Sequence, residues 1–199
     1  MKLSCLITEN KNKRVGNNNV AICHDKSLHE LPPDLPTEVT GYFSCANNAL
    51  TTMKNCPLKV ESLYCNDNRL TSLEYIPKII NGNLSVAGNA ISTFEHFPTE
   101  VHGNFNLTHN KTITSLQGIQ KHLRHVDSCI EFKGCPIKSH ILGLLLIYIG
   151  GDIVIFGNPA DKSYIVDIIM NRWKNQGRKG ILGAQRELIA AGYKELAQL

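Results

Sequence analysis

Several patterns that mark enzymes and membrane proteins are missing from this sequence. It has no nucleophile elbow, no glycine-rich phosphate loop and no H-E-x-x-H zinc helix. No secretory signal opens it, and the apolar run at residues 141–150 is too short to cross a bilayer. The net charge of +4 is mild and demands no acidic partner. We therefore expect a non-enzymatic protein that needs no cofactor and has no membrane partner.

Cysteine is present without the pairing that disulfide frameworks and zinc sites use. The seven cysteines are an odd number and include no C-x-x-C pair. Five of them stand at inward positions of the repeat described below, and we interpret these as small core residues: Cys23, Cys45, Cys56, Cys65 and Cys135. Such usage is typical of a reducing environment and predicts a cytoplasmic location.

A repeat dominates what the sequence does contain. Between Pro36 and Leu116 the form Φ-x-Φ-x-x-Asn-x-Φ occurs four times, where Φ is apolar, and its asparagines are spaced by 20, 21 and 21 residues. A proline with an apolar residue three positions later precedes each of the four copies. This is the period of a leucine-rich repeat. We expect one asparagine in each clear coil to satisfy buried backbone groups: Asn48, Asn68, Asn89, Asn110 and, in a later coil, Asn158.

Stacking follows from the repeat, because a single coil cannot bury its apolar face alone. Each Φ-x-Φ segment predicts a short strand, and stacked strands form a parallel sheet. The predicted fold is an α/β leucine-rich-repeat solenoid with short parallel strands on its concave face. We assign residues 1–19 to an N-terminal cap with a polar turn at 9–14, residues 20–160 to about seven coils, and residues 161–199 to a helical C-terminal cap.

The C-terminal cap is predicted from a change of period. Apolar residues at Ile165, Ile168, Ile169 and Trp173 favour an amphipathic helix over 163–175. We expect a break at 177–180 and further short helices after it.

The repeats resemble those of secreted bacterial effectors and, more closely, small leucine-rich-repeat proteins encoded by tailed bacteriophages. The repeat resemblance covers about residues 20–158, and a similar tail covers residues 141–199. It implies a phage accessory protein in the bacterial cytoplasm that binds a host protein, including a defence protein, or a phage protein. Effector ubiquitin ligases append a large catalytic domain, and only about 40 residues follow the last coil here, so that activity does not carry over.

Outward residues of stacked strands line up into columns, which usually form the binding face of a solenoid. Tyrosine beside asparagine combines apolar area with hydrogen bonding, which suits protein recognition. The hypothesis is that seven residues contact a partner: Tyr42, Tyr64, Asn66, Asn83, Asn104, Asn106 and Glu131. The alternative is that they are solvated strand faces without a partner. An open sheet edge also allows self-association.

Two other sites are weighed against this one. A basic stretch around one tryptophan could bind the phosphates of a nucleic acid or a nucleotide and stack on a base, through Arg172, Trp173, Lys174, Arg178 and Lys179. Cations at a helix C-terminus more often complement the helix dipole, so nucleic acid is the less favoured partner. A metal site is conceivable among His102, His109, His122, His125 and Cys129, but their spacing matches no specific zinc pattern, and we predict no metal.

Overall fold

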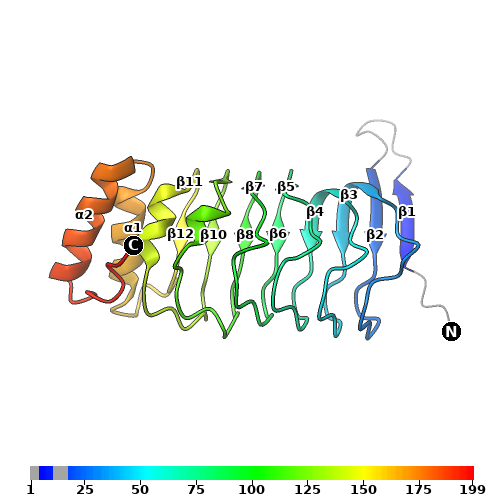
Figure 1. The fold of residues 1–199 in the computed structure, drawn as a ribbon, viewed down its shortest axis with the longest axis horizontal. Coiled ribbons are helices and arrows are strands. Elements are labelled where there is room, and N and C mark those ends of the chain that lie inside the picture. Colours follow the sequence, from blue (N-terminus) through cyan, green and yellow to red (C-terminus); the bar gives the residue numbers. More distant parts are fainter. Residues whose placement is uncertain (1–4, 11–17) are drawn as a thin grey trace.

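The computed structural model describes residues 5–10 and 18–199. Its strands lie across the long axis of the molecule and are stacked one after another along it (Figure 1). The main sheet has eight strands, in spatial order β1 (Leu6–Asn10), β2 (Asn18–Ile22), β3 (Glu38–Ser44), β4 (Lys59–Tyr64), β6 (Leu84–Ser85), β8 (Phe105–Asn106), β10 (Ile130–Glu131) and β12 (Ile153–Val154). From β2 to β12 every neighbouring pair is parallel. The prediction of a parallel-strand solenoid is confirmed.

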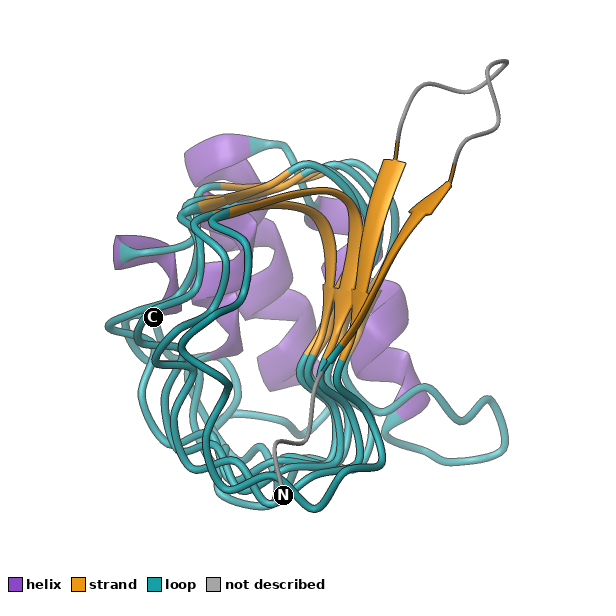
Figure 2. Cartoon of the chain, turned by 90° about the vertical axis from the view of Figure 1, so that its right-hand side faces the viewer, coloured by secondary structure: helices purple, strands orange, loops and turns teal. Residues whose placement is uncertain are grey.

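A second parallel sheet lies beside the main one. Its order is β11 (Tyr148–Ile149), β9 (His125–Val126), β7 (Glu100–Val101) and β5 (Ile79–Ile80). Viewed along the stack, the two sheets meet at a corner (Figure 2). Four coils pass through the second sheet, as β5, β7, β9 and β11, before they enter the main one, whereas β3 and β4 belong to the main sheet over their whole length. The apolar residue three positions after a proline is the buried residue of the second sheet at Ile80 and Val101.

The core fills the coils with one apolar side chain above another. Residues facing inward from the main sheet are completely buried, namely Phe43, Leu63, Leu84, Phe105, Ile130 and Ile153. Their burial removes apolar surface from water, which is the principal favourable contribution to folding of this stack.

Ladder asparagines connect the coils, as predicted, at four positions. The Asn68 amide nitrogen donates to the carbonyls of Cys45 and Cys65 at 3.0 and 3.2 Å, and its oxygen accepts from the Leu50 N–H at 3.0 Å. Equivalent bonds are made by Asn48, Asn89 and Asn110. The prediction is wrong for Asn158, which is exposed and whose side-chain oxygen accepts, among the described residues, only from the nearby Ala160 N–H.

Glycine marks the corner between the two sheets. At Gly103 an added Cβ would lie 2.6 Å from Asn83 Oδ1 and 2.7 Å from the Gly82 carbonyl. Glycine is therefore required at position 103 because the preceding coil comes too close to leave room for a Cβ. The reason is not a positive φ, since the backbone at Gly103 does not adopt one.

Two α-helices cover the C-terminal end of the stack: α1 (Tyr164–Trp173) and α2 (Gly177–Ala190) (Figure 1). The expected break at 177–180 is wrong, because those residues form the first turn of α2. The 3₁₀ helices η1 (Ile119–Lys121) and η2 (Ile141–Leu146) lie within the coils. Among the residues described, no helix has the length and apolar character that a bilayer crossing requires.

The face that α1 buries differs from the predicted one. Val166, Ile169 and Met170 are buried, whereas Ile165 and Ile168 are 38% and 42% exposed. The reason is that α1 turns polar side chains toward the backbone of the last coil, which rotates Ile165 and Ile168 outward. The apolar spacing alone could not reveal this requirement.

A disulfide joins Cys5 and Cys23, so the expectation that Cys23 is a free core thiol is wrong. The antiparallel register of β1 on β2 places Leu6 opposite Ile22, and the next pair outward is Cys5 and Cys23. The repeat gave no sign of an antiparallel first strand. Free and buried thiols are found, as expected, at Cys45, Cys56, Cys65 and Cys135. Of the predicted polar turn, residues 11–14 lie outside the described residues.

Candidate functional site

Two tyrosines stand on the outer face of the main sheet, near its N-terminal end. Tyr42 extends from β3 and Tyr64 from β4, and their rings meet edge to face with centroids 6.0 Å apart. Tyr42 is 40% exposed and Tyr64 is partly exposed. Neither phenol is hydrogen-bonded to any residue that the structure describes, so both hydroxyl groups are available to a partner.

The two asparagines predicted beside them have a structural role. Asn83 Oδ1 accepts from the Asn104 backbone N–H at 2.8 Å, and Asn104 Oδ1 accepts from the Cys129 N–H at 3.2 Å. Ser62 begins the same row by accepting from the Asn83 N–H at 3.0 Å. This row lies at the corner between the sheets, where it satisfies backbone donors that the strands leave unpaired. The side-chain oxygens of Asn83 and Asn104 are therefore used to join successive coils.

The remaining predicted contact residues are bound to close neighbours. The Asn66 amide donates to the Asp67 carboxylate at 2.7 Å, and Asn106 Oδ1 accepts from the Thr108 N–H at 2.9 Å. Glu131 pairs with Lys133 at 2.9 Å. All three side chains stay partly exposed on the outer face of the main sheet. Five of the seven predicted residues thus lie on the outer face of the main sheet or directly after its strands, and Asn83 and Asn104 lie at its corner. Tyr42 and Tyr64 are the only aromatic residues of the seven.

Most of the basic stretch is engaged within the C-terminal cap. Arg172 Nη1 and Trp173 Nε1 both donate to Glu187, at 2.5 and 3.0 Å, and Trp173 packs against the core. Lys174 Nζ donates to the Gly151 carbonyl and lies 3.4 Å from Asp152. Arg178 and Lys179 are exposed on the first turn of α2. Of the five predicted residues, only Arg178 and Lys179 thus make no hydrogen bond or ion pair among the described residues, while Arg172 is exposed but paired and Trp173 is partly buried.

A depression of about 440 Å³ lies where the last coil meets the cap. Its walls include Val154, Tyr164, Asp167 and Asn171. The two polar residues among these bind the backbone of β12 and the turn after it: Asp167 accepts from the Ile155 N–H at 3.0 Å. Desolvation by burial raises the pKa of the Asp167 carboxyl, against the opposing effect of its backbone N–H donors. Asp167 and Asn171 are thus engaged with the backbone of the last coil.

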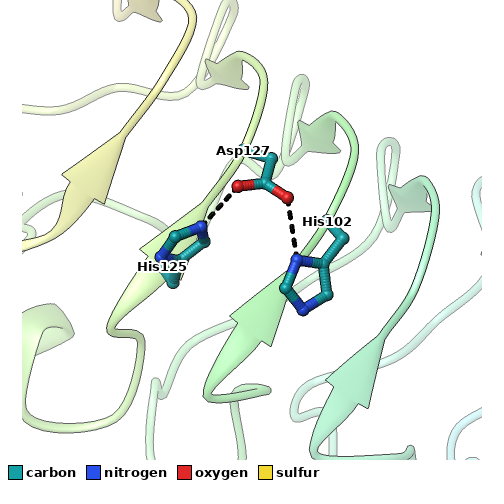
Figure 3. Close-up of side chains that lie close together, drawn as sticks. All are labelled: His102, His125 and Asp127. Atoms are coloured by element: carbon teal, nitrogen blue, oxygen red, sulfur yellow. Dashed lines mark hydrogen bonds and ion pairs between the residues drawn. The ribbon is translucent and has the colours of Figure 1, made fainter.

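The outer face of the second sheet carries a cluster of ionisable side chains (Figure 3). Asp127 lies between two histidines, with Oδ2 2.8 Å from His102 Nδ1 and Oδ1 2.5 Å from His125 Nε2. Glu100 Oε2 is 3.3 Å from the other ring nitrogen of His102. The hydrogen bond to Asp127 raises the pKa of His102, and the two histidines lower the pKa of Asp127.

Sequence reasoning found part of this cluster. His102 and His125 belong to the weighed metal set, but His109, His122 and Cys129 lie outside the cluster. Asp127 was missed. The sequence did contain a signal for it: the alternating segments E-x-H at 100–102 and H-x-D at 125–127 occupy equivalent positions of the repeat and therefore lie on neighbouring strands.

Comparison with known proteins gives no indication of the function, which is therefore inferred from the sequence and the structure. No family model, no curated protein and no solved structure matches this chain.

Proposed function

We propose that the chain is a non-enzymatic leucine-rich-repeat scaffold that binds a protein partner through the outer face of the main sheet, around Tyr42 and Tyr64. The observation that carries this proposal is the exposed edge-to-face pair that the two rings form on adjacent strands. Tyrosine combines a large apolar ring with a hydroxyl group, and it is enriched among residues that dominate binding energy in protein interfaces.

Rigidity of the surface supports the same function. Tyr42 and Tyr64 lie on paired parallel strands, and the Ser62 side chain ties the coil of Tyr64 to the next coil by accepting from the Asn83 N–H. A partner would not have to order this surface on binding, which lowers the entropic cost of association. The resemblance of the repeats further suggests a phage protein in the bacterial cytoplasm that binds a host defence protein or another phage protein.

Nucleic-acid binding through the C-terminal cap is the alternative, and the geometry favours it less. Of the residues proposed for it, Arg172, Trp173 and Lys174 have partners within the cap, which leaves Arg178 and Lys179 without a hydrogen bond or ion pair among the described residues. Pairing of Arg172 with Glu187 and of Lys174 with Asp152 reduces the phosphate neutralisation that this set can supply, on which such binding depends.

Affinity capture from bacterial lysate with nuclease treatment tests the proposal. The bait is the full chain, compared with a Tyr42→Ala/Tyr64→Ala variant and with Tyr148→Ala as a matched control. Tyr148 is 51% exposed but lies on the second sheet. We expect a stoichiometric protein that survives nuclease, is lost from the double variant and is retained by Tyr148→Ala.

Other outcomes contradict the proposal in distinguishable ways. Equal capture by the double variant would exclude the tyrosine surface. Loss with Tyr148→Ala alone would move binding to the second sheet. Recovery of nucleic acid, or of proteins that nuclease removes, would support the C-terminal cap, and an Arg178→Ala/Lys179→Ala variant would then abolish that recovery.

A further inference from the structure

Two neighbouring strands of the second sheet each present a carboxylate and an imidazole to solvent. The parallel register pairs buried Val101 of β7 with buried Val126 of β9. Side chains alternate along a strand, so the residues on either side of each valine point outward together. This register brings His102 beside Asp127 and Glu100 beside His125, two acids and two histidines in one group.

Three of these side chains bring ligand atoms close together. His102, His125 and Asp127 each offer one such atom, and the three atoms all lie within 4.8 Å of one another. In a zinc site such atoms lie about 2.0–2.2 Å from the ion. Both histidine rings and the carboxylate are about one-third or more exposed. Modest rotations of these exposed side chains would therefore bring all three ligand atoms into contact with one ion.

Each histidine ring also contacts a neighbouring side chain that can fix its orientation. Glu100 Oε2 is 3.3 Å from His102 Nε2, the nitrogen that faces away from Asp127. Histidines that bind metal usually donate their other N–H to a carboxylate or carbonyl, which fixes the tautomer. The His125 ring stacks on Tyr148 with centroids 4.6 Å apart and planes inclined by 25°. This support distinguishes the group from a chance meeting of surface charges.

We propose that His102, His125 and Asp127 bind one divalent transition-metal ion of the zinc class, with Glu100 as a positioning residue for His102. Two imidazoles and one carboxylate suit zinc and its transition-metal neighbours, whereas calcium and magnesium prefer oxygen ligands throughout. Three protein ligands leave at least one coordination position open to solvent, where water or a side chain of another protein can bind. This site lies on a different sheet from the tyrosine surface and does not depend on it.

Zinc titration of the full chain tests the site. The purification tag is removed, the protein is treated with chelator and dialysed, and Zn²⁺ binding is followed by calorimetry and by competition with a chromogenic chelator. We expect one ion per chain. His102→Ala and Asp127→Asn should abolish saturable binding, while Glu100→Gln should weaken it about 10–100-fold, the usual effect of removing a carboxylate that orients a ligand.

Two control variants exclude other ligands. His29→Ala removes an exposed histidine far along the chain from the cluster, and Cys129→Ser removes the one free cysteine that is not buried among the described residues. Both should bind Zn²⁺ as the parent does. Circular dichroism confirms that each variant is folded, which is expected because the substituted side chains are not core residues.

Spectroscopy identifies the ligands directly. Zn²⁺ should shift the imidazole NMR signals of His102 and His125 alone among the eight histidines, and Co²⁺ should bind without a thiolate charge-transfer band. The proposal is overturned if the parent shows no saturable binding, if His102→Ala and Asp127→Asn bind normally, or if Cys129→Ser alone loses the ion. In the first case the cluster is an ordinary His–Asp–His hydrogen-bonded group.

Discussion

The side-chain amide of Asn171 takes the place of a neighbouring strand for Ile153. Its Nδ2 donates to the Ile153 carbonyl at 2.7 Å, and its Oδ1 accepts from the Ile153 N–H at 2.9 Å. Asn175 pairs in the same way with Ile149 of the second sheet, at 2.7 and 3.1 Å. Asn171 of α1 and Asn175 of the link after it thus cover the last strand of each sheet, which would otherwise be an open template for pairing with another chain.

Replacing Asn171 by alanine should therefore expose the edge of β12. We expect Asn171→Ala to lower the free energy of unfolding by about 1–3 kcal/mol, because the buried N–H and carbonyl of Ile153 lose their partners. Urea denaturation measures this loss, and sedimentation velocity shows whether the exposed edge promotes self-association. Arg178→Ala, an exposed change on the neighbouring helix, is the control. An unchanged denaturation midpoint would mean that the amide pairing contributes nothing.

The ladder asparagines permit a comparison within one chain. Asn68→Ala removes hydrogen bonds that join two successive coils, and we expect it to cost about 1–3 kcal/mol of stability. Asn158→Ala, at the exposed position that the repeat wrongly assigned to the ladder, should stay within about 0.5 kcal/mol of the parent. Equal effects of the two changes in chemical denaturation would contradict a structural ladder.

Packing between the two helices depends on a small residue. A Cβ added at Gly183 would lie 2.6 Å from ring atoms of Trp173. We expect Gly183→Ala to destabilise the protein by about 1–3 kcal/mol through overpacking, despite the better helix propensity of alanine. Leu182→Ala, at an adjacent exposed position, should have little effect in the same thermal unfolding experiment. A more stable Gly183→Ala protein would show that Trp173 moves aside freely.

Thiol labelling should follow burial. Burial raises the pKa of Cys45, Cys56 and Cys135, and that of Cys65 to about 12, so these thiols stay protonated and shielded near neutral pH. We expect an alkylating reagent to modify Cys129 first in the native protein. The four buried thiols should react only in denaturant, and Cys5 and Cys23 only after reduction. Mass spectrometry of the labelled peptides checks this order; rapid native labelling of Cys65 would contradict it.

The repeat by itself determined most of the fold. Its period of 20 or 21 residues predicts stacked coils, because apolar side chains at fixed offsets have no other common place than a shared interior. The asparagine column follows from the need to satisfy backbone groups in that interior, and four of the five predicted members take part. Tyr42 and Tyr64 were likewise predicted on the outer face of the main sheet, since alternation along a strand fixes which way a residue points.

Only the tertiary structure decided the rest, because the deciding contacts involve segments outside the regular repeat or coils of unequal length. The antiparallel register of β1 pairs Cys5 with Cys23, and the edge of β12 determines which face α1 buries. Asp127 joins His102 and His125 only because coils of unequal length still align at β7 and β9. The sequence states which residues point outward, but the stacking of particular coils determines which of them meet.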